Sequence, residues 1–293
     1  MNQCCPKFFL PEVLNLSFNY YGFFYSIFLL VVAALFFVII RQKDKTSVHS
    51  YLLLMIISSA AWIIKETLDR FANTAQAAAF WDTFRLFGWP FLVPATLAFC
   101  LAYTNRGKLL ANFLVKLLLF GPSFLIVFLG FNTDLIFSHN PADLIRNRYL
   151  YWESPTGFIY NFFVAPWIVC LMLTSLVILY QYLKQVKDQA RRKQAIIVFW
   201  AILIPAIGSL ATDIFVPIMK IPSIFELGVP LVALSIGMLT YGIVRYRLFV
   251  INPAVVATNI VETMNEILIV FSALDQKIEY VNSAIQKILG FPK

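Results

Sequence analysis

Hydrophobic residues occur in long runs, and charged or turn-forming residues bound each run. A helix of about 20 mainly apolar residues is long enough to cross the hydrocarbon core of a bilayer. The second run is the weakest, because its apolar part is short and ends at Lys65, Glu66, Asp69 and Arg70. The pattern predicts seven spanning helices, at residues 20–40, 51–64, 84–103, 111–131, 158–182, 195–219 and 227–244.

The composition points to the same class of protein. Hydrophobic residues make up 60% of the chain and charged residues 13%, and the mean hydropathy is +0.79. These values lie outside the range of soluble globular domains. We therefore expect an all-α membrane protein, a seven-transmembrane helix bundle with the lipid bilayer as its surroundings. The net charge of +8 would suggest nucleic acid in a soluble chain, but here its placement is explained by membrane topology, and no nucleic-acid partner is expected.

Basic residues concentrate in alternate loops. Arg41, Lys43 and Lys45 follow the first predicted helix, and a basic run from Lys184 to Lys193 follows the fifth. Cytoplasmic loops carry an excess of lysine and arginine, so the amino terminus is predicted outside and the carboxy terminus in the cytoplasm. The first apolar run starts late and reaches full spanning length, so no cleavable signal peptide is expected.

Polar and ionisable residues gather at the predicted outer ends of the helices. Such groups are costly near a bilayer and mark candidate functional sites. Asp82 and Arg85 are three residues apart, which permits an ion pair on one helix face, and Asp213 would need a partner such as Arg85 if it faces inward. One hypothesis is a ligand-sensing outer pocket; the alternative is a set of helix-end groups that extend to the interface. The candidate residues are Asp82, Arg85, Asn161, Asp213 and Glu226.

The longest predicted outer loop covers residues 132–156. It contains the turn sequence HNPAD from His139 and the aromatic sequence YLYWE from Tyr149. Two interpretations remain open, an aromatic belt at the membrane interface and a lid over an outward pocket.

The composition changes after Leu248. Asn252 and Pro253 are suited to start a helix, and residues 252–264 have the spacing of a short amphipathic connecting helix. Strands are predicted at 267–271 and 278–281, with a turn at Asp275 and Gln276 between them, and a helix follows from Ala284.

This order, in the sequence EILIVFSALDQKIEYVNSAIQKILGF, resembles the start of a PAS sensory domain. The preceding helix, ELGVPLVALSIGMLTYGIVRYRLF, is similar to the end of the amino-terminal seven-helix region of bacterial sensor histidine kinases. The resemblance implies signal coupling through Pro230, Arg245, Tyr246, Arg247 and Leu248. It also implies an outer tail at 1–19, a sensor bundle at 20–248, a linker at 249–265 and an incomplete, truncated α/β PAS start at 266–293.

The resemblance further implies a location in the bacterial inner membrane, a homodimer, and a cytoplasmic response regulator reached through a missing output domain. The only histidines are His49 and His139, neither placed as a phosphoacceptor, and no ATP-binding glycine pattern is present. We therefore expect no catalytic residue, metal or cofactor in this chain, whereas the full-length protein would be a histidine kinase or another PAS-linked signalling enzyme.

Short loops and an aromatic content of 16% fit a small hydrophobic or amphipathic ligand that arrives through the membrane, and a change in the bilayer or a partner protein would fit as well. A rival interpretation is a small-molecule or ion transporter or channel, because such proteins also use intramembrane acids such as Asp213 and interrupted helices. A retinal protein is disfavoured, since residues 227–244 contain no lysine for a Schiff base.

Overall fold

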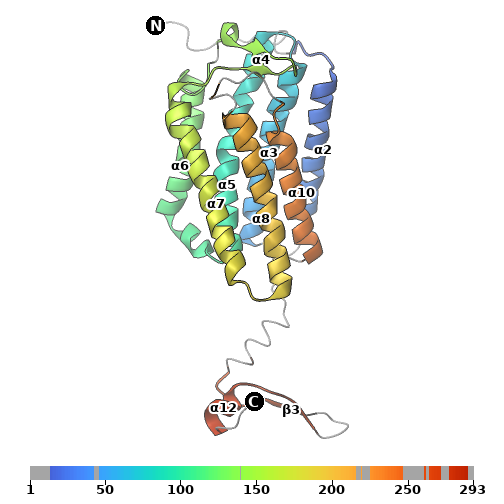
Figure 1. The fold of residues 1–293 in the computed structure, drawn as a ribbon, viewed down its shortest axis with the longest axis vertical. Coiled ribbons are helices and arrows are strands. Elements are labelled where there is room, and N and C mark those ends of the chain that lie inside the picture. The colour runs from blue at the N-terminus through green and yellow to red at the C-terminus, as the bar shows by residue number, and fades with distance from the viewer. Residues whose placement is uncertain are drawn as a thin grey trace. The chain divides into compact units, whose positions relative to one another are not determined.

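The computed structural model describes residues 14–42, 46–138, 140–215, 219, 225–246, 261, 264–271 and 277–289. The chain divides into two compact units, Met1–Leu248 and Phe249–Lys293. The first unit is a bundle of long helices (Figure 1). Within the described residues, six helices are long and apolar enough to cross a membrane, and a shorter apolar helix follows at Gly228–Val244.

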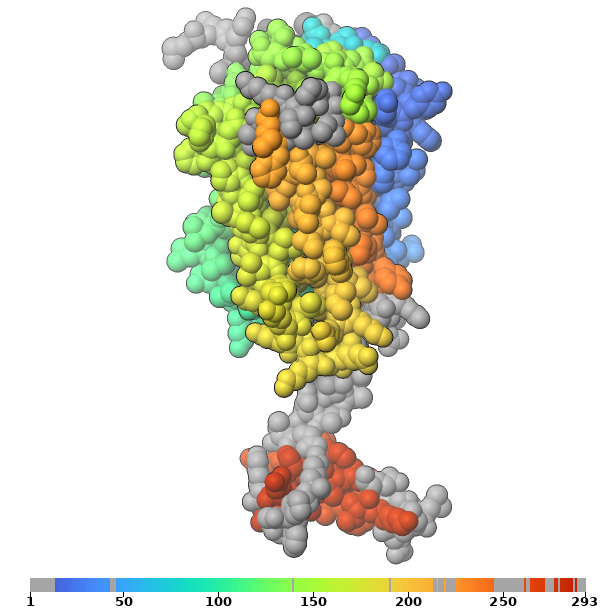
Figure 2. Space-filling view, in the orientation of Figure 1, coloured from blue at the N-terminus to red at the C-terminus, as the bar shows by residue number. Residues whose placement is uncertain are grey.

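The bundle is a ring of five helices with two more outside it. Consecutive ring members contact one another, and α10 closes the ring against α3. Helix α2 (Tyr20–Ile40) packs outside the ring against α3 and α10, and α6 (Phe113–Asn132) packs outside against α5. Figure 2 shows α7, α8 and α10 along one face of the bundle. The ring consists of α3 (Ser47–Phe71), α5 (Trp89–Tyr103), α7 (Ala165–Gln185), α8 (Gln189–Ser209) and α10 (Gly228–Tyr246).

The peripheral helices expose apolar side chains, as a lipid environment requires. Leu118 of α6 is 75% exposed and Leu30 of α2 is 71% exposed. Helix α5, in contrast, is buried along most of its length, although Pro94 lies inside it. Pro90 lies in the first turn of this helix, where a proline removes no helical hydrogen bond.

Local sequence explains where several helices begin. The Asn19 side chain accepts a hydrogen bond from the Gly22 N–H at 2.8 Å and caps α2. At α3, Thr46 and His49 form a capping box, and the Thr46 N–H donates to His49 Nδ1 at 3.1 Å. His49 is buried, and its side chain stabilises the start of the helix.

Several of the predicted helices differ from the structure at their ends. The predicted end of the second helix at residue 64 is wrong, since α3 continues to Phe71 and includes four charged residues. The third segment begins earlier than predicted, with α4 (Ala75–Asp82) and the 3-10 turn η1 (Thr83–Phe87) before α5. The basic run after the fifth helix is also mostly helical, because α8 starts at Gln189.

A loop between α6 and α7 covers one end of the ring. This cap loop, residues 133–138 and 140–157, contains the 3-10 turn η3 (Pro141–Asp143) and a hairpin of β1 (Ile145–Arg146) and β2 (Trp152–Glu153). The π-helical turn η4 (Tyr160–Val164) leads from it into α7. A further bridge joins Phe137 to Thr156, so the two arms of the loop are paired near its base as well as at the hairpin.

The cap loop ends at a glycine that no larger residue can replace without movement of the backbone. A Cβ at Gly157 would overlap the carbonyl of Leu135, and the Gly157 N–H donates to the Ile136 carbonyl at 2.7 Å. Gly157→Ala should therefore lower the free energy of unfolding by about 1–3 kcal/mol, measured by thermal unfolding of the detergent-solubilised protein. Gly237→Ala is the matched control, because a Cβ there meets nothing within 4 Å and should be neutral or stabilising.

In the second unit, β3 (Ile269–Phe271) pairs antiparallel with β4 (Ile278–Val281), and α12 (Ala284–Leu289) follows. Asn282 is fully buried. Its side chain accepts from the Leu268 N–H at 3.0 Å and donates to the Glu266 carbonyl at 2.9 Å. The predicted order of strand, strand and helix is confirmed for these residues. The predicted linker helix at 252–264 lies outside the described residues except for 261 and 264.

Candidate functional site

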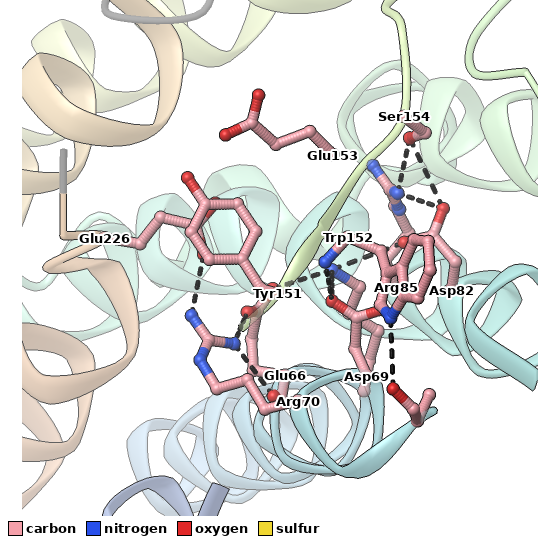
Figure 3. A network of polar contacts seen from close by, with 12 residues as sticks. Glu66, Asp69, Arg70, Asp82, Arg85, Tyr151, Trp152, Glu153, Ser154 and Glu226 are labelled. Atoms are coloured by element: carbon pink, nitrogen blue, oxygen red, sulfur yellow. Dashed lines mark hydrogen bonds and ion pairs between the residues drawn. The ribbon is translucent and has the colours of Figure 1, made fainter. Parts of the chain in front are cut away.

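Seven charged residues form one connected network at the end of the ring beneath the cap loop (Figure 3). Lys65 of α3 is its centre. The Lys65 Nζ lies 3.0 Å from Glu66 Oε1, 3.3 Å from Asp82 Oδ1 and 3.7 Å from Asp69 Oδ2. The members are Lys65, Glu66, Asp69, Arg70, Asp82, Arg85 and Glu226; we call them the charge network.

Arg70 extends the network to the start of α10. Its Nη1 pairs with the Glu66 carboxylate one helical turn earlier, and its Nη2 lies 3.2 Å from Glu226 Oε2. The guanidinium carbon is 3.8 Å from the centre of the Tyr25 ring, and the side chain is fully buried. Cation–π contact and two carboxylates together compensate the burial of this charge.

Arg85 extends the network in the other direction. It pairs with Asp82, as their i,i+3 spacing predicts, and its Nη2 donates to Ser154 Oγ of the cap loop at 2.7 Å. Its guanidinium also lies 4.1 Å from the centre of the Phe137 ring. Asp82 is buried and Arg85 largely so, which does not fit the alternative of helix-end groups extended to the membrane interface.

The cap loop is fastened directly to this network. The Trp152 backbone N–H donates to Asp69 Oδ2 at 3.0 Å, and its indole Nε1–H donates to the Ala72 carbonyl at 3.2 Å. Leu150 adopts φ 62°, a left-handed conformation that is uncommon for a leucine. The neighbouring Asn147 side chain accepts from the Tyr149 N–H at 2.9 Å and thereby stabilises the turn.

Tyr151 of the cap loop points toward the network (Figure 3). Its ring centre lies 5.0 Å from the Arg70 guanidinium. Burial raises the pKa of the Tyr151 hydroxyl well above its usual value, and the nearby negative charges of Glu226 and Glu153 raise it further. Tyr151 is therefore a neutral hydrogen-bonding group at any physiological pH.

A cavity of about 910 Å³ lies beside the network and the cap loop and extends into the ring. This volume is at the upper end of the range typical of small-molecule sites. All five ring helices contribute to its walls. At its deep end the lining is apolar, with Met55, Leu92, Ile202 and Ile236, whereas its other end is polar, with Lys65, Glu66, Arg85, Glu153, Ser154 and Glu226.

Two of the wall helices have π-helical turns beside the polar end of the cavity. They are η4 before α7 and η5 (Leu210–Phe215) after α8. Tyr160 and Asn161 of η4, and Leu210 and Thr212 of η5, line the cavity. Such π turns are rare in proteins as a whole, and those that occur are frequently found at functional sites.

The structure brings four of the five predicted pocket residues to this end of the ring. Arg85, Asn161 and Glu226 line the cavity, and Asp82 lies behind its wall in the charge network. The Asn161 Oδ1 accepts from the Thr156 hydroxyl at 3.2 Å. The backbone of Asp213 lies in η5, but its side chain lies outside the described residues, so its pairing with Arg85 stays a prediction.

The sequence prediction did not assign a site role to the four charged residues of α3. They form two opposite-charge pairs at i,i+4 spacing, Lys65 with Asp69 and Glu66 with Arg70. That spacing is a helical signal, and it could have indicated both that α3 continues past residue 64 and that these charges share one helix end.

The predicted coupling residues lie at opposite ends of α10. Pro230 is near its start, where it lines a shallow apolar groove with Phe28 and Tyr241. Arg245 and Tyr246 end the helix, with side chains outside the described residues, and Arg247 and Leu248 lie outside them altogether. Proline in the first turn of a helix does not interrupt it, so α10 is one continuous element.

The chain matches the model of a known protein family. A family model described as the N-terminal 7TM region of histidine kinase matches residues 23–253. The matched segment includes every helix of the ring, the cap loop, the charge network and the end of α10. No curated protein sequence matches the chain significantly.

Proposed function

The chain belongs to the family of N-terminal seven-transmembrane regions of histidine kinases, and from this premise we propose that it is the input module of a bacterial two-component sensor kinase. The observation that carries the proposal is the family match over residues 23–253. Within that segment, a capped cavity of about 910 Å³ gives a stimulus a place to act inside the bundle.

A route for the signal runs along α10. Glu226 precedes this helix at the cavity and is held by Arg70 at 3.2 Å, while Arg245 and Tyr246 end it on the far side of the bundle. The 19 residues of α10 span about 28 Å, close to the thickness of a bilayer core. A shift at Glu226 would thus reach the opposite end of the bundle through one rigid element.

In the proposed arrangement the amino terminus and the cap loop face outward and the carboxy terminus lies in the cytoplasm. The linker at 249–265 then connects α10 to a PAS domain that begins at 266, and a kinase output acts on a response regulator. The buried hydrogen bonds of Asn282 and the strand pairing of β3 with β4 are compatible with a PAS start. Pairing of two receptors through their linkers would make the unit a homodimer.

The proposal is tested by the signal output of the complete gene product. Arg85→Gln and Asp213→Asn should change the stimulus dose response or the basal autophosphorylation in membrane vesicles by about fivefold or more, while membrane insertion stays intact. Asp134→Asn, in the cap loop but not among the cavity-lining residues, is the matched control. A wild-type dose response in both site variants would contradict the proposal.

The rival function is transport of a small molecule or ion through the cavity. Buried charges at the cavity end would suit such a pathway. Proteoliposomes that contain only this chain distinguish the two. Protein-dependent uptake would favour a transporter, whereas strict dependence of kinase output on the bundle, without uptake, favours the sensor.

A further inference from the structure

The cavity has the form of a site for an amphiphile. Met55 at the apolar end and Lys65 at the polar end both belong to α3 and are ten residues apart, which corresponds to about 15 Å along the helix axis. An occupant of this length would have an apolar body among the ring helices and one polar head under the cap loop.

The charges at the polar end indicate the sign of that head. Among the described residues that line the cavity, the cations are Lys65 and Arg85, whereas four carboxylates line it: Glu66, Asp143, Glu153 and Glu226. Both cations are already paired with carboxylates of the charge network, as Lys65 contacts three and Arg85 pairs with Asp82. Glu66 and Glu226 are in turn paired with Arg70 of the charge network. When the whole network is counted with Asp143 and Glu153, three cations face six carboxylates, so the described part of the polar end carries an excess of negative charge.

Two of these carboxylates are accessible. The Glu226 side chain is 27% exposed, in contrast to the buried Glu66, and Glu153 is exposed with its Oε1 accepting from the Asn147 amide at 2.9 Å. Burial is the main cause of the raised pKa of the Tyr151 hydroxyl, and the negative charges of Glu226 and Glu153 raise it further. Tyr151 thus marks the space that the two carboxylates share.

Aromatic side chains also line the cavity. Trp62, Trp89 and Tyr160 line the cavity between its polar end and its apolar depth, and Met172 adds a polarisable thioether. The face of an aromatic ring attracts a cation, and tryptophan does so most strongly. A bulky ammonium head would thus find both carboxylates and ring faces within one cavity.

We propose that the cavity binds a cationic amphiphile, an amine or quaternary ammonium whose head lies by Glu226, Glu153 and Tyr151 and whose apolar body extends toward Met55. The excess of carboxylates would repel an anionic head. A neutral head is the stronger rival, because the buried Nε of Arg85 has no hydrogen-bond partner among the described residues and could donate to a carbonyl. The inference rests on the proposed function only for its signalling meaning, since binding is measurable without any output domain.

The test compares three probes that have the same octyl group: octyltrimethylammonium, octanol and octyl sulfate. Their binding is measured to the protein in neutral-lipid nanodiscs. Binding is followed by the change in tryptophan fluorescence, to which Trp62, Trp89 and Trp152 in the cavity wall contribute among the six tryptophans of the chain, with protein-free nanodiscs subtracted. We expect the ammonium probe to bind about tenfold more tightly than the other two. Glu226→Gln should remove most of this preference, and Asp134→Asn should leave it unchanged.

Equal binding of the three probes, or a preference for octyl sulfate or octanol, would overturn the proposal. If Glu226→Gln does not fold, Glu153→Gln at the exposed strand β2 gives the same comparison, and an unchanged preference there would also overturn it. If the wild-type protein shows no preference for the ammonium probe while kinase output still depends on the bundle, the proposed ligand class is rejected and the proposed function stands. Absence of output dependence would reject the proposed function, whatever the probes show.

Discussion

Replacement of Arg70 by alanine should lower the free energy of unfolding by about 3–5 kcal/mol. Arg70 is fully buried and pairs with Glu66 and Glu226, so its removal takes one cation from each carboxylate and leaves Glu66 paired with Lys65. The same change removes the contact between the guanidinium and the Tyr25 ring at 3.8 Å. The loss should appear as a lower unfolding midpoint in detergent micelles, measured by circular dichroism.

Arg192→Ala is the matched control for this measurement. Arg192 is exposed in the first turns of α8 at the opposite end of the bundle, where loss of a charge should cost less than about 0.5 kcal/mol. Equal stability of Arg70→Ala and the control would show that the charge network does not hold the ring together.

Replacement of Lys65 by methionine should have an effect of similar size, about 3–5 kcal/mol, for a different reason. Methionine fills much of the same volume, but Glu66, Asp69 and Asp82 lose their shared cation. Asp69 also accepts the Trp152 N–H, and Asp82 pairs with Arg85, which bonds to Ser154. The variant should therefore loosen the cap loop as well as the ring.

Hydrogen exchange separates these two consequences. Amides of residues 144–156 should lose protection in Lys65→Met under conditions in which the centre of α5 remains protected. Lys184→Met, an exposed residue in the last turn of α7, should change neither quantity. Wild-type protection of the cap loop in Lys65→Met would mean that the loop is held independently of the network.

Much of the bundle can be predicted from local sequence, because a long apolar run marks each spanning helix. The predicted helix 20–40 is α2 to the residue, and 111–131 lies within two residues of α6. The predicted end of the second helix, at residue 64, was wrong because charged residues normally end an apolar span. In the structure α3 continues, since acidic side chains within the fold pair with Lys65 and Arg70. Compensation of that kind depends on tertiary contacts, which hydropathy does not contain.

The candidate site could be predicted only in outline. Depth along the helices placed Asp82, Arg85, Asn161 and Glu226 at one end of the bundle, since helix direction alternates from one span to the next. The contact between Arg70 and Glu226 joins residues 156 positions apart, so no local spacing reports it. The fastening of Trp152 to Asp69 likewise depends on how the cap loop folds back over the ring.

The most direct test of the central claim, that a stimulus is sensed in the capped cavity and changes the kinase, is a measurement of autophosphorylation on the complete receptor in membrane vesicles. Ala206→Trp places an indole in the cavity from a buried position on α8, while Ile207→Trp, at the next residue, adds the same side chain where the helix is 61% exposed. The account predicts a change of about fivefold or more for Ala206→Trp and a wild-type rate for Ile207→Trp. Equal, wild-type autophosphorylation in two correctly inserted variants would contradict it.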